Sequence, residues 1–263
     1  MISILAVETT GKYGSAAVIM EDGRVFCATS ETEMNHLRDI ITISDEAVRN
    51  AGITKNDLTH VAASAGPGSF TGIRIGVTTA RTLAQMLDIP CIRVSSLQGL
   101  AVRALDRAIS AEATYVVPVI NARRHQTYAG AWQAVFTSDY EKQSAISVLE
   151  ERQYMIEELL EIITGKITDG SKVLFTGDGI DAYEEIIREA FAAAGMDDQL
   201  MMAEPDLRYQ NAASVAEIAM TSALAGNILG YEELLPDYMR LSEAEQRLRE
   251  GTLSDKIRKA VKI

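Results

Sequence analysis

The chain has 263 residues, 47% of them hydrophobic and 24% charged, and its 25 basic and 37 acidic residues give a net charge of −12. This composition is typical of a water-soluble globular protein and argues against tight binding of nucleic acid by the chain alone. No apolar run approaches the roughly 20 residues of a membrane span. Cys27 and Cys91 form no CxxC pair, so we expect a cytoplasmic protein with no membrane segment.

The first hundred residues predict alternating strands and helices. An Asp22-Gly23 turn joins the second strand to the third, and Asn35 and Gly52 mark the two ends of the first helix. Strands are expected at 2–7, 15–20, 24–29, 60–65 and 91–94, and helices at about 35–51, 71–87 and 97–109.

The second half repeats this pattern. Strands are expected at 115–120, 127–136, 145–149 and 172–176, and helices at 154–163, 182–194 and 211–229. Both halves open strand–turn–strand and continue with helices and strands, which predicts an α/β protein of two similar lobes with mixed sheets. We expect an N-terminal lobe over 1–110, a C-terminal lobe over 111–210, an apolar helix over 211–230 that packs back on the lobes, and a tail over 231–263. The tail predicts a solvated helix broken near Gly251.

A glycine-rich segment, Gly66-Pro-Gly-Ser-Phe-Thr-Gly-Ile-Arg-Ile-Gly76, connects a predicted strand to a predicted helix. Such a turn can bind a phosphate at the helix N-terminus. The spacing does not fit the known phosphate loops, because the segment has no lysine and reads GxGxxxG rather than GxGxxG. We therefore interpret the segment as a tight turn, with Ser69 or Thr71 as the helix cap.

The helix that follows has very small residues along one side, at Gly72, Gly76, Ala80 and Ala84. Glycine within a helix costs up to about 1 kcal/mol relative to alanine. Close approach of another backbone offsets this cost. The neighbour is either an element of the same chain, which the spacing slightly favours, or a second protein.

The segment from Gly66 to Gly76 resembles the signature of the TsaB (YeaZ) family. Three further segments are similar to family motifs in order and spacing, so that the resemblance spans residues 2–240: Ala6-Val-Glu-Thr-Thr10, Asn121-Ala-Arg123 and Pro236-Asp-Tyr-Met-Arg240. The resemblance implies the actin-like, sugar-kinase and Hsp70 (ASKHA) fold, with two lobes that each hold a mixed sheet flanked by helices.

The resemblance also implies a function. Members of this family pair with their catalytic paralogue TsaD, and the ATPase TsaE joins them. Together these proteins form threonylcarbamoyladenosine beside the anticodon of tRNAs that read codons beginning with A. The resemblance implies tRNA contact only through the complex, and a homodimer is expected when the partner is missing. Docking is expected through the helices at 35–51 and 71–87, at His36, Leu37, Ile40, Ile41, Gly72, Ile73, Gly76, Val77, Ala80 and Ala84.

Nucleotide chemistry is less well supported. Glu8 and Asn121 stand where the family usually has, or often has, aspartate. The resemblance implies no required cofactor and leaves weak ATP or ADP binding open, with contacts expected at Glu8, Thr9, Thr10, Gly177 and Gly179.

The residues that a metal-dependent enzyme or a hydrolase would need are not evident in the sequence. TsaD holds a metal with two histidines spaced i, i+4 on a helix, whereas Ile40 stands four residues after His36, so no metal site is expected. A glycoprotease-like hydrolase needs a nucleophile beside a base, and none is evident near His36, His60 or His125. A stand-alone ATPase or small-molecule kinase of the same fold is the remaining alternative. We expect no catalytic residues in this chain.

Overall fold

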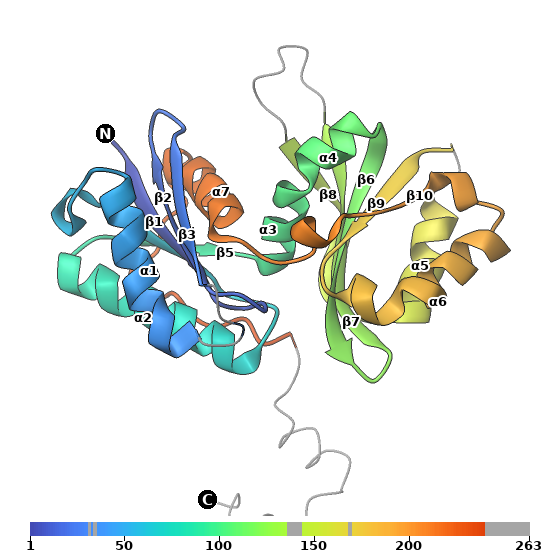
Figure 1. Cartoon of the computed structure of the whole chain (residues 1–263), viewed down its shortest axis with the longest axis horizontal. Coiled ribbons are helices and arrows are strands. Elements are labelled where there is room, and N and C mark those ends of the chain that lie inside the picture. The colour runs from blue at the N-terminus through green and yellow to red at the C-terminus, as the bar shows by residue number, and fades with distance from the viewer. Residues whose placement is uncertain (31–32, 34–35, 136–143, 168–169, 240–263) are drawn as a thin grey trace, which may run out of the picture.

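The computed structural model describes residues 1–30, 33, 36–135, 144–167 and 170–239, which form two lobes (Figure 1). The first lobe holds a five-stranded mixed sheet in the order β3-β2-β1-β4-β5. Its strands are β1 (Ser3–Glu8), β2 (Ser15–Met20), β3 (Val25–Thr29), β4 (His60–Ser64) and β5 (Cys91–Val94). The β1–β2 and β2–β3 pairs are antiparallel, whereas β1–β4 and β4–β5 are parallel.

The second lobe repeats this topology. Its strands are β6 (Ala113–Arg123), β7 (Gln126–Val135), β8 (Ser144–Met155), β9 (Lys172–Thr176) and β10 (Leu200–Met202), in the order β8-β7-β6-β9-β10. Here too the first three strands pair antiparallel and the last two join in parallel. The prediction of two similar lobes with mixed sheets and the ASKHA fold is therefore confirmed.

Helices cover both faces of each sheet (Figure 1). On the first sheet, α1 (His36–Asn50) and α2 (Phe70–Leu87) pack on one face and α7 (Ala212–Leu224) on the other. On the second sheet, α3 (Ser96–Arg103) and α4 (Leu105–Ser110) face α5 (Ile156–Lys166) and α6 (Gly179–Ala193) across the strands. Three 3-10 turns complete the elements, at Lys55–Asp57, Asp197–Gln199 and Pro205–Leu207.

Two segments cross between the lobes. The α3–α4 segment follows the first sheet in sequence, yet Leu97, Leu100 and Leu105 pack against the second sheet beside Trp132. Conversely, α7 follows the second sheet and packs Val215 and its alanines on the first. The lobes are thus joined by packed helices as well as by connecting loops.

Several predicted elements differ from the structure. The single helix expected at 97–109 is two helices that meet at Ala104, and the short strand expected at 145–149 runs on to Met155. The helix expected to reach residue 229 ends at Leu224, because Gly226 turns the chain with φ +74° and Leu229 then bridges to Cys91. Strand β10 was not predicted, since three residues show no periodicity. The tail helix and the Asn35 cap lie outside the described residues.

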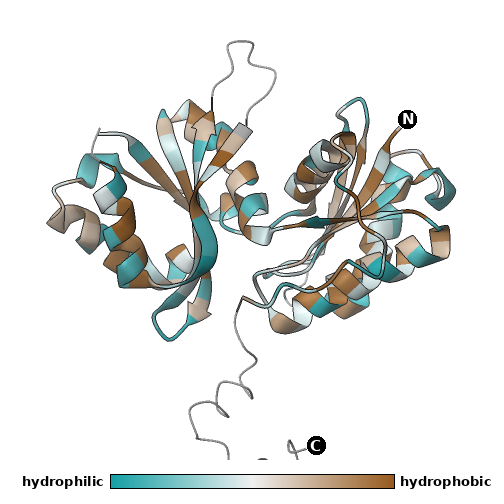
Figure 2. Cartoon of the chain, turned by 180° about the vertical axis from the view of Figure 1, so that it is seen from behind, coloured by the Kyte–Doolittle hydropathy of each residue, from teal (hydrophilic) through white to brown (hydrophobic). Residues whose placement is uncertain are grey.

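Buried apolar residues of the strands and of the helices that cover them form the cores of the two lobes. Figure 2 shows many hydrophobic residues in these strands and helices. The strands β1 and β2 are buried along their whole length, which explains their continuous apolar runs. Among the helices that the structure describes, none is long and apolar enough to cross a membrane.

The small-residue side of α2 packs against the end of β1. A Cβ on Gly72 would lie 1.9 Å from the Thr9 carbonyl oxygen, and one on Gly76 would lie 2.5 Å from Thr9 Oγ1. The Thr9 hydroxyl donates a hydrogen bond to the Gly72 carbonyl at 2.7 Å. Packing within the chain therefore accounts for the glycines, which is the first of the two alternatives that the sequence left open.

This contact predicts a stability difference between two helical glycines. Gly72→Ala should destabilise the protein by at least about 2 kcal/mol, because the new methyl group would overlap the Thr9 backbone. Gly165→Ala in α5 should instead stabilise it by about 0.5 kcal/mol, since nothing lies within 4 Å of that position and alanine favours the helix. Urea unfolding of both variants measures the difference, and equal effects would contradict the packing argument.

Candidate functional site

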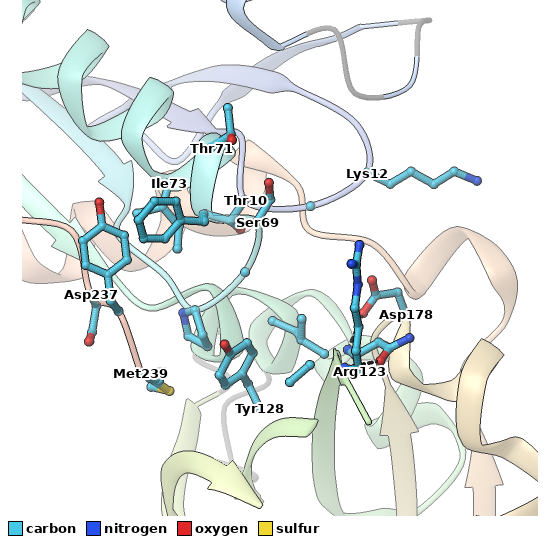
Figure 3. Close-up of a pocket in the computed structure, with 18 of the residues that line it drawn as sticks. Thr10, Lys12, Ser69, Thr71, Ile73, Arg123, Tyr128, Asp178, Asp237 and Met239 are labelled. Carbon is cyan, nitrogen blue, oxygen red and sulfur yellow. Dashed lines mark hydrogen bonds between the residues drawn. The ribbon is translucent and has the colours of Figure 1, made fainter. Parts of the chain in front are cut away.

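A cleft of about 950 Å³ lies between the lobes (Figure 3). The first lobe contributes the β1–β2 turn at Thr10–Lys12 and the start of α2. The second lobe contributes the end of β6, Asp178 and Tyr209, and the segment Asp237–Met239 lies along one side. In sheets of this kind, ligand sites form outside the carboxyl ends of the strands, which is where these groups lie.

The glycine-rich segment forms the first-lobe wall. Ser69 caps α2 by accepting a hydrogen bond from the Gly72 N–H at 3.2 Å, and its own N–H donates to the Thr10 carbonyl at 2.8 Å. A side chain on Gly68, where φ is +154°, would collide with Thr10. The interpretation of this segment as a tight, capped turn is confirmed.

Glu8 lies behind this wall and is fully buried. Its Oε1 atom accepts hydrogen bonds from the Thr10 N–H at 2.5 Å and from the Thr10 hydroxyl at 2.6 Å. Burial raises the pKa of the Glu8 carboxyl, and the hydrogen bonds counteract this only in part. The side chain therefore holds the β1–β2 turn rather than facing the cleft.

Of the five residues predicted to contact a nucleotide, only Thr10 lines the cleft. Thr9 is buried against α2, as described above. Gly177 and Gly179 approach the Val119 carbonyl so closely that a Cβ would lie 2.1 and 2.8 Å from it. These glycines let α6 begin beside β6.

An acidic cluster that the sequence did not indicate lies on the second-lobe side. Asp178 accepts a hydrogen bond from the Asn121 N–H at 3.0 Å, and burial raises its pKa to about 6. Asp181 pairs with Arg208 at 2.7 Å and accepts a bond from the Tyr209 hydroxyl at 3.1 Å. The Gly-Asp-Gly turn was the available signal, but Asp178, between the two predicted glycines, is the residue that reaches the cleft.

Each of the three histidines has a different hydrogen-bond partner. His36 is buried with its Nε2 atom 2.9 Å from the Gly11 carbonyl, and desolvation lowers its pKa. His60 lies 2.8 Å from the Thr59 hydroxyl, and His125 lies 3.2 Å from Glu157. Among the described side chains, no group of three His, Cys, Asp or Glu residues is placed to hold a metal ion.

The predicted docking residues divide into two sets. Leu37 and Ile41 lie one turn apart on the outer side of α1, with 77% and 59% of their surface exposed. The other eight are buried inside the chain: His36, Ile40, Gly72, Ile73, Gly76, Val77, Ala80 and Ala84. Buried residues can affect a partner only through the shape and position of the helices that carry them.

The Pro-x-Tyr segment fastens the end of the described chain to the first lobe. Asp237 forms an ion pair with Arg93, and its N–H donates to the Ala65 carbonyl at 2.7 Å. The Tyr238 ring lies 4.7 Å from the Phe70 ring, and Arg74 donates to the Tyr238 hydroxyl at 2.9 Å. Arg240, the last residue of that motif, lies outside the described residues.

Comparison with known proteins gives consistent matches. Residues 29–248 match the family model described as TsaD: tRNA N6-adenosine threonylcarbamoyltransferase. The tRNA threonylcarbamoyladenosine biosynthesis protein TsaB of Bacillus subtilis is 29% identical, covering 94% of this chain and 97% of that protein. TsaB of Escherichia coli is 25% identical, covering 93% and 97%. The solved structure of YeaZ from Pseudomonas aeruginosa has the same fold, with a TM-score of 0.67 at 20% identity, covering 90% and 100%.

The buried Glu8 carboxyl predicts a pH dependence of stability. Its pKa is raised in the folded protein, so its contribution is greatest below the ordinary glutamate value of 4.5 and is lost as the pH rises through the folded value. Glu8→Gln keeps an acceptor for Thr10 and cannot ionise. We expect the stability of this variant relative to the wild type to increase as the pH rises from 5 to 8, because only the wild-type carboxyl must ionise in its buried site. Urea unfolding at pH 5 and pH 8 measures the free energy of unfolding of both proteins. The same difference between variant and wild type at the two pH values would contradict the prediction.

Proposed function

Because this chain belongs to the TsaB (YeaZ) family, we propose that it is a non-catalytic subunit in the synthesis of threonylcarbamoyladenosine in tRNA. Its partner is TsaD, and TsaE joins the pair. The tRNA is bound through the complex rather than by this chain, which agrees with the net charge of −12. The relatives named for this biosynthesis match over nearly their whole length, which supports the assignment.

The observation that carries the docking proposal is the apolar pair on α1. Leu37 and Ile41 are large, exposed and four residues apart, so they lie on one helix face. Beside them, α2 packs on the same side of the first sheet. An exposed apolar helix face of this kind is a common docking surface.

The non-catalytic proposal rests on where the acidic and basic groups lie. His36 is buried against Gly11, and Ile40 occupies the position one turn later, inside the core. Glu8 is buried behind the β1–β2 turn. No cofactor is required under this proposal, and any ATP or ADP binding would be weak.

Docking is tested by changing one exposed leucine. Leu37→Asp should weaken the complex with TsaD from the same organism at least about tenfold, because a charge would be buried in an apolar contact. Ile146→Asp is a matched control, since Ile146 is also apolar and 56% exposed but lies on β8 of the second lobe. Isothermal titration calorimetry measures both affinities.

Two results would count against docking through α1. One is that the wild-type chain and TsaD form no heterodimer at micromolar concentration in size-exclusion chromatography with light scattering. The other is that Leu37→Asp and Ile146→Asp weaken binding equally. Sedimentation of the chain alone would also show whether Leu37→Asp removes the homodimer expected in the absence of TsaD.

The non-catalytic role is tested by nucleotide hydrolysis. The purified chain alone should hydrolyse ATP no faster than buffer. Asp178 is the cleft carboxylate without a cationic partner among the described residues, so it is the residue to change. Turnover by the wild type that disappears in Asp178→Asn would instead favour the alternative of a stand-alone ATPase or kinase.

A further inference from the structure

The turn between β1 and β2 holds the N-terminal end of α1, which is the part of the helix that carries the apolar pair. His36 is the first residue of α1, and its Nε2–H donates to the Gly11 carbonyl at 2.9 Å, since a carbonyl can only accept. Just before the helix, Glu33 pairs with Lys12 at 2.8 Å and accepts a hydrogen bond from the Tyr13 hydroxyl at 3.1 Å. These contacts join the start of the docking helix to a turn that forms part of the cleft wall.

Ser30 adds a further connection between the same turn and α1. Its N–H donates to the Gly14 carbonyl at 2.8 Å, at the far end of the turn. Its hydroxyl donates to Asp39 at 2.6 Å, in the first turn of the helix. The first turn of a helix has N–H groups without partners inside the helix, so its order depends on contacts from outside the helix.

From the other lobe, Tyr209 packs on the β1–β2 turn. The rings of Tyr13 and Tyr209 meet edge to face, with centroids 5.6 Å apart and planes at 89°. The Lys12 Nζ atom lies 5.3 Å from the Tyr209 ring centroid, so the ammonium group and the ring attract each other. Tyr209 is itself fixed to the second lobe, because its hydroxyl donates to Asp181 on α6 at 3.1 Å.

Gln210, the next residue, packs against the turn at Gly11. The Gln210 side chain is buried, and a Cβ on Gly11 would lie 2.1 Å from its Oε1 atom. Within the described part of the chain, neither amide atom of Gln210 has a hydrogen-bond partner, which is unfavourable for a buried amide. The side chain therefore provides close packing rather than hydrogen bonding, and Gly11 contacts both Gln210 and His36.

We propose that Tyr209 is a positioning residue for docking: through the β1–β2 turn, the second lobe holds the N-terminal end of α1 in the conformation that the partner binds. This inference rests on the docking proposed above. A helix end that is ordered before association loses less conformational entropy on binding, which strengthens the complex. Loss of the Tyr209 ring should therefore weaken docking from a distance.

The contacts of Tyr209 leave the turn as its connection to α1. Among the described residues, its side-chain hydrogen bond and its ring contacts go to the turn and to α6, and none goes to α1. Tyr209 lines the cleft between the lobes, whereas Leu37 and Ile41 are exposed on α1 of the first lobe (Figure 1). An effect of Tyr209 on docking must therefore pass through the β1–β2 turn.

Amide hydrogen exchange of the free chain tests whether Tyr209 orders α1. Tyr209→Ala should speed the exchange of the amides at 37–41 at least about fivefold, because the turn loses its support from the second lobe, while the amides of α5 keep their wild-type rates. Tyr209→Phe keeps the ring contact with Tyr13 and should change these rates less than about twofold. Tyr115→Ala is the matched control, since Tyr115 is a partly buried tyrosine that packs on the second-lobe core.

Calorimetric titration with TsaD tests whether this order matters for docking. Tyr209→Ala should weaken binding about three- to tenfold, the range expected for the ordering of one side chain on association. Tyr209→Phe and Tyr115→Ala should bind within about twofold of the wild type. Adding Tyr13→Ala to Tyr209→Ala should weaken binding by no more than about a further twofold, because both changes break the same connection. Thermal unfolding of each variant establishes that it is folded.

The proposal is overturned if Tyr209→Ala exchanges or binds as the wild type does, if Tyr115→Ala has the same effects, or if the Tyr13 and Tyr209 changes are additive. Equal behaviour of Tyr209→Phe and Tyr209→Ala would also contradict it, since the ring contact would then have no effect. If the wild type does not bind TsaD, the proposed function fails. The exchange experiment needs no partner, so it still decides whether Tyr209 orders α1.

Discussion

The contact between Thr9 and the start of α2 is the constraint on which the first lobe and its side of the cleft depend. The Thr9 carbonyl approaches the helix backbone because Gly72 and Gly76 have no side chains. This approach positions the Ser69 cap and the Thr10 carbonyl that receives the Ser69 N–H. The glycine-rich segment is therefore required for packing of α2 against the end of β1. The first-lobe wall of the cleft follows from this packing.

In the second lobe, glycines at the equivalent place in the topology also allow a helix to approach a strand closely. Gly177 and Gly179 lie after β9 as Gly66 and Gly68 lie after β4, and they approach the backbone of β6, the counterpart of β1. In each lobe, glycine lets the helix after the fourth strand begin close to the first strand. The two cleft walls are thus built by the same kind of packing. They differ in side chains, since Arg124 and His125 occupy the β6–β7 turn.

Net charge and local charge differ in this protein. The chain as a whole is strongly acidic, which opposes a long polyanion. Inside the cleft, ion pairs with Arg93 and Arg208 offset two carboxylates, whereas Arg123 and Arg124 are left unpaired among the described residues.

The sequence by itself determined most strands, most helices and the family, because buried apolar runs, glycine turns and capping residues act locally. It also restricted the reason for the small-residue side of α2 to two alternatives. Tertiary structure decided between them by bringing Thr9 against Gly72, a contact 63 residues apart in sequence. It also decided that Leu37 and Ile41 face outward while Ile40 is buried, and that Asp178 rather than its flanking glycines reaches the cleft. Burial and the pairing of charges depend on which distant segments meet, and that information is not local in the chain.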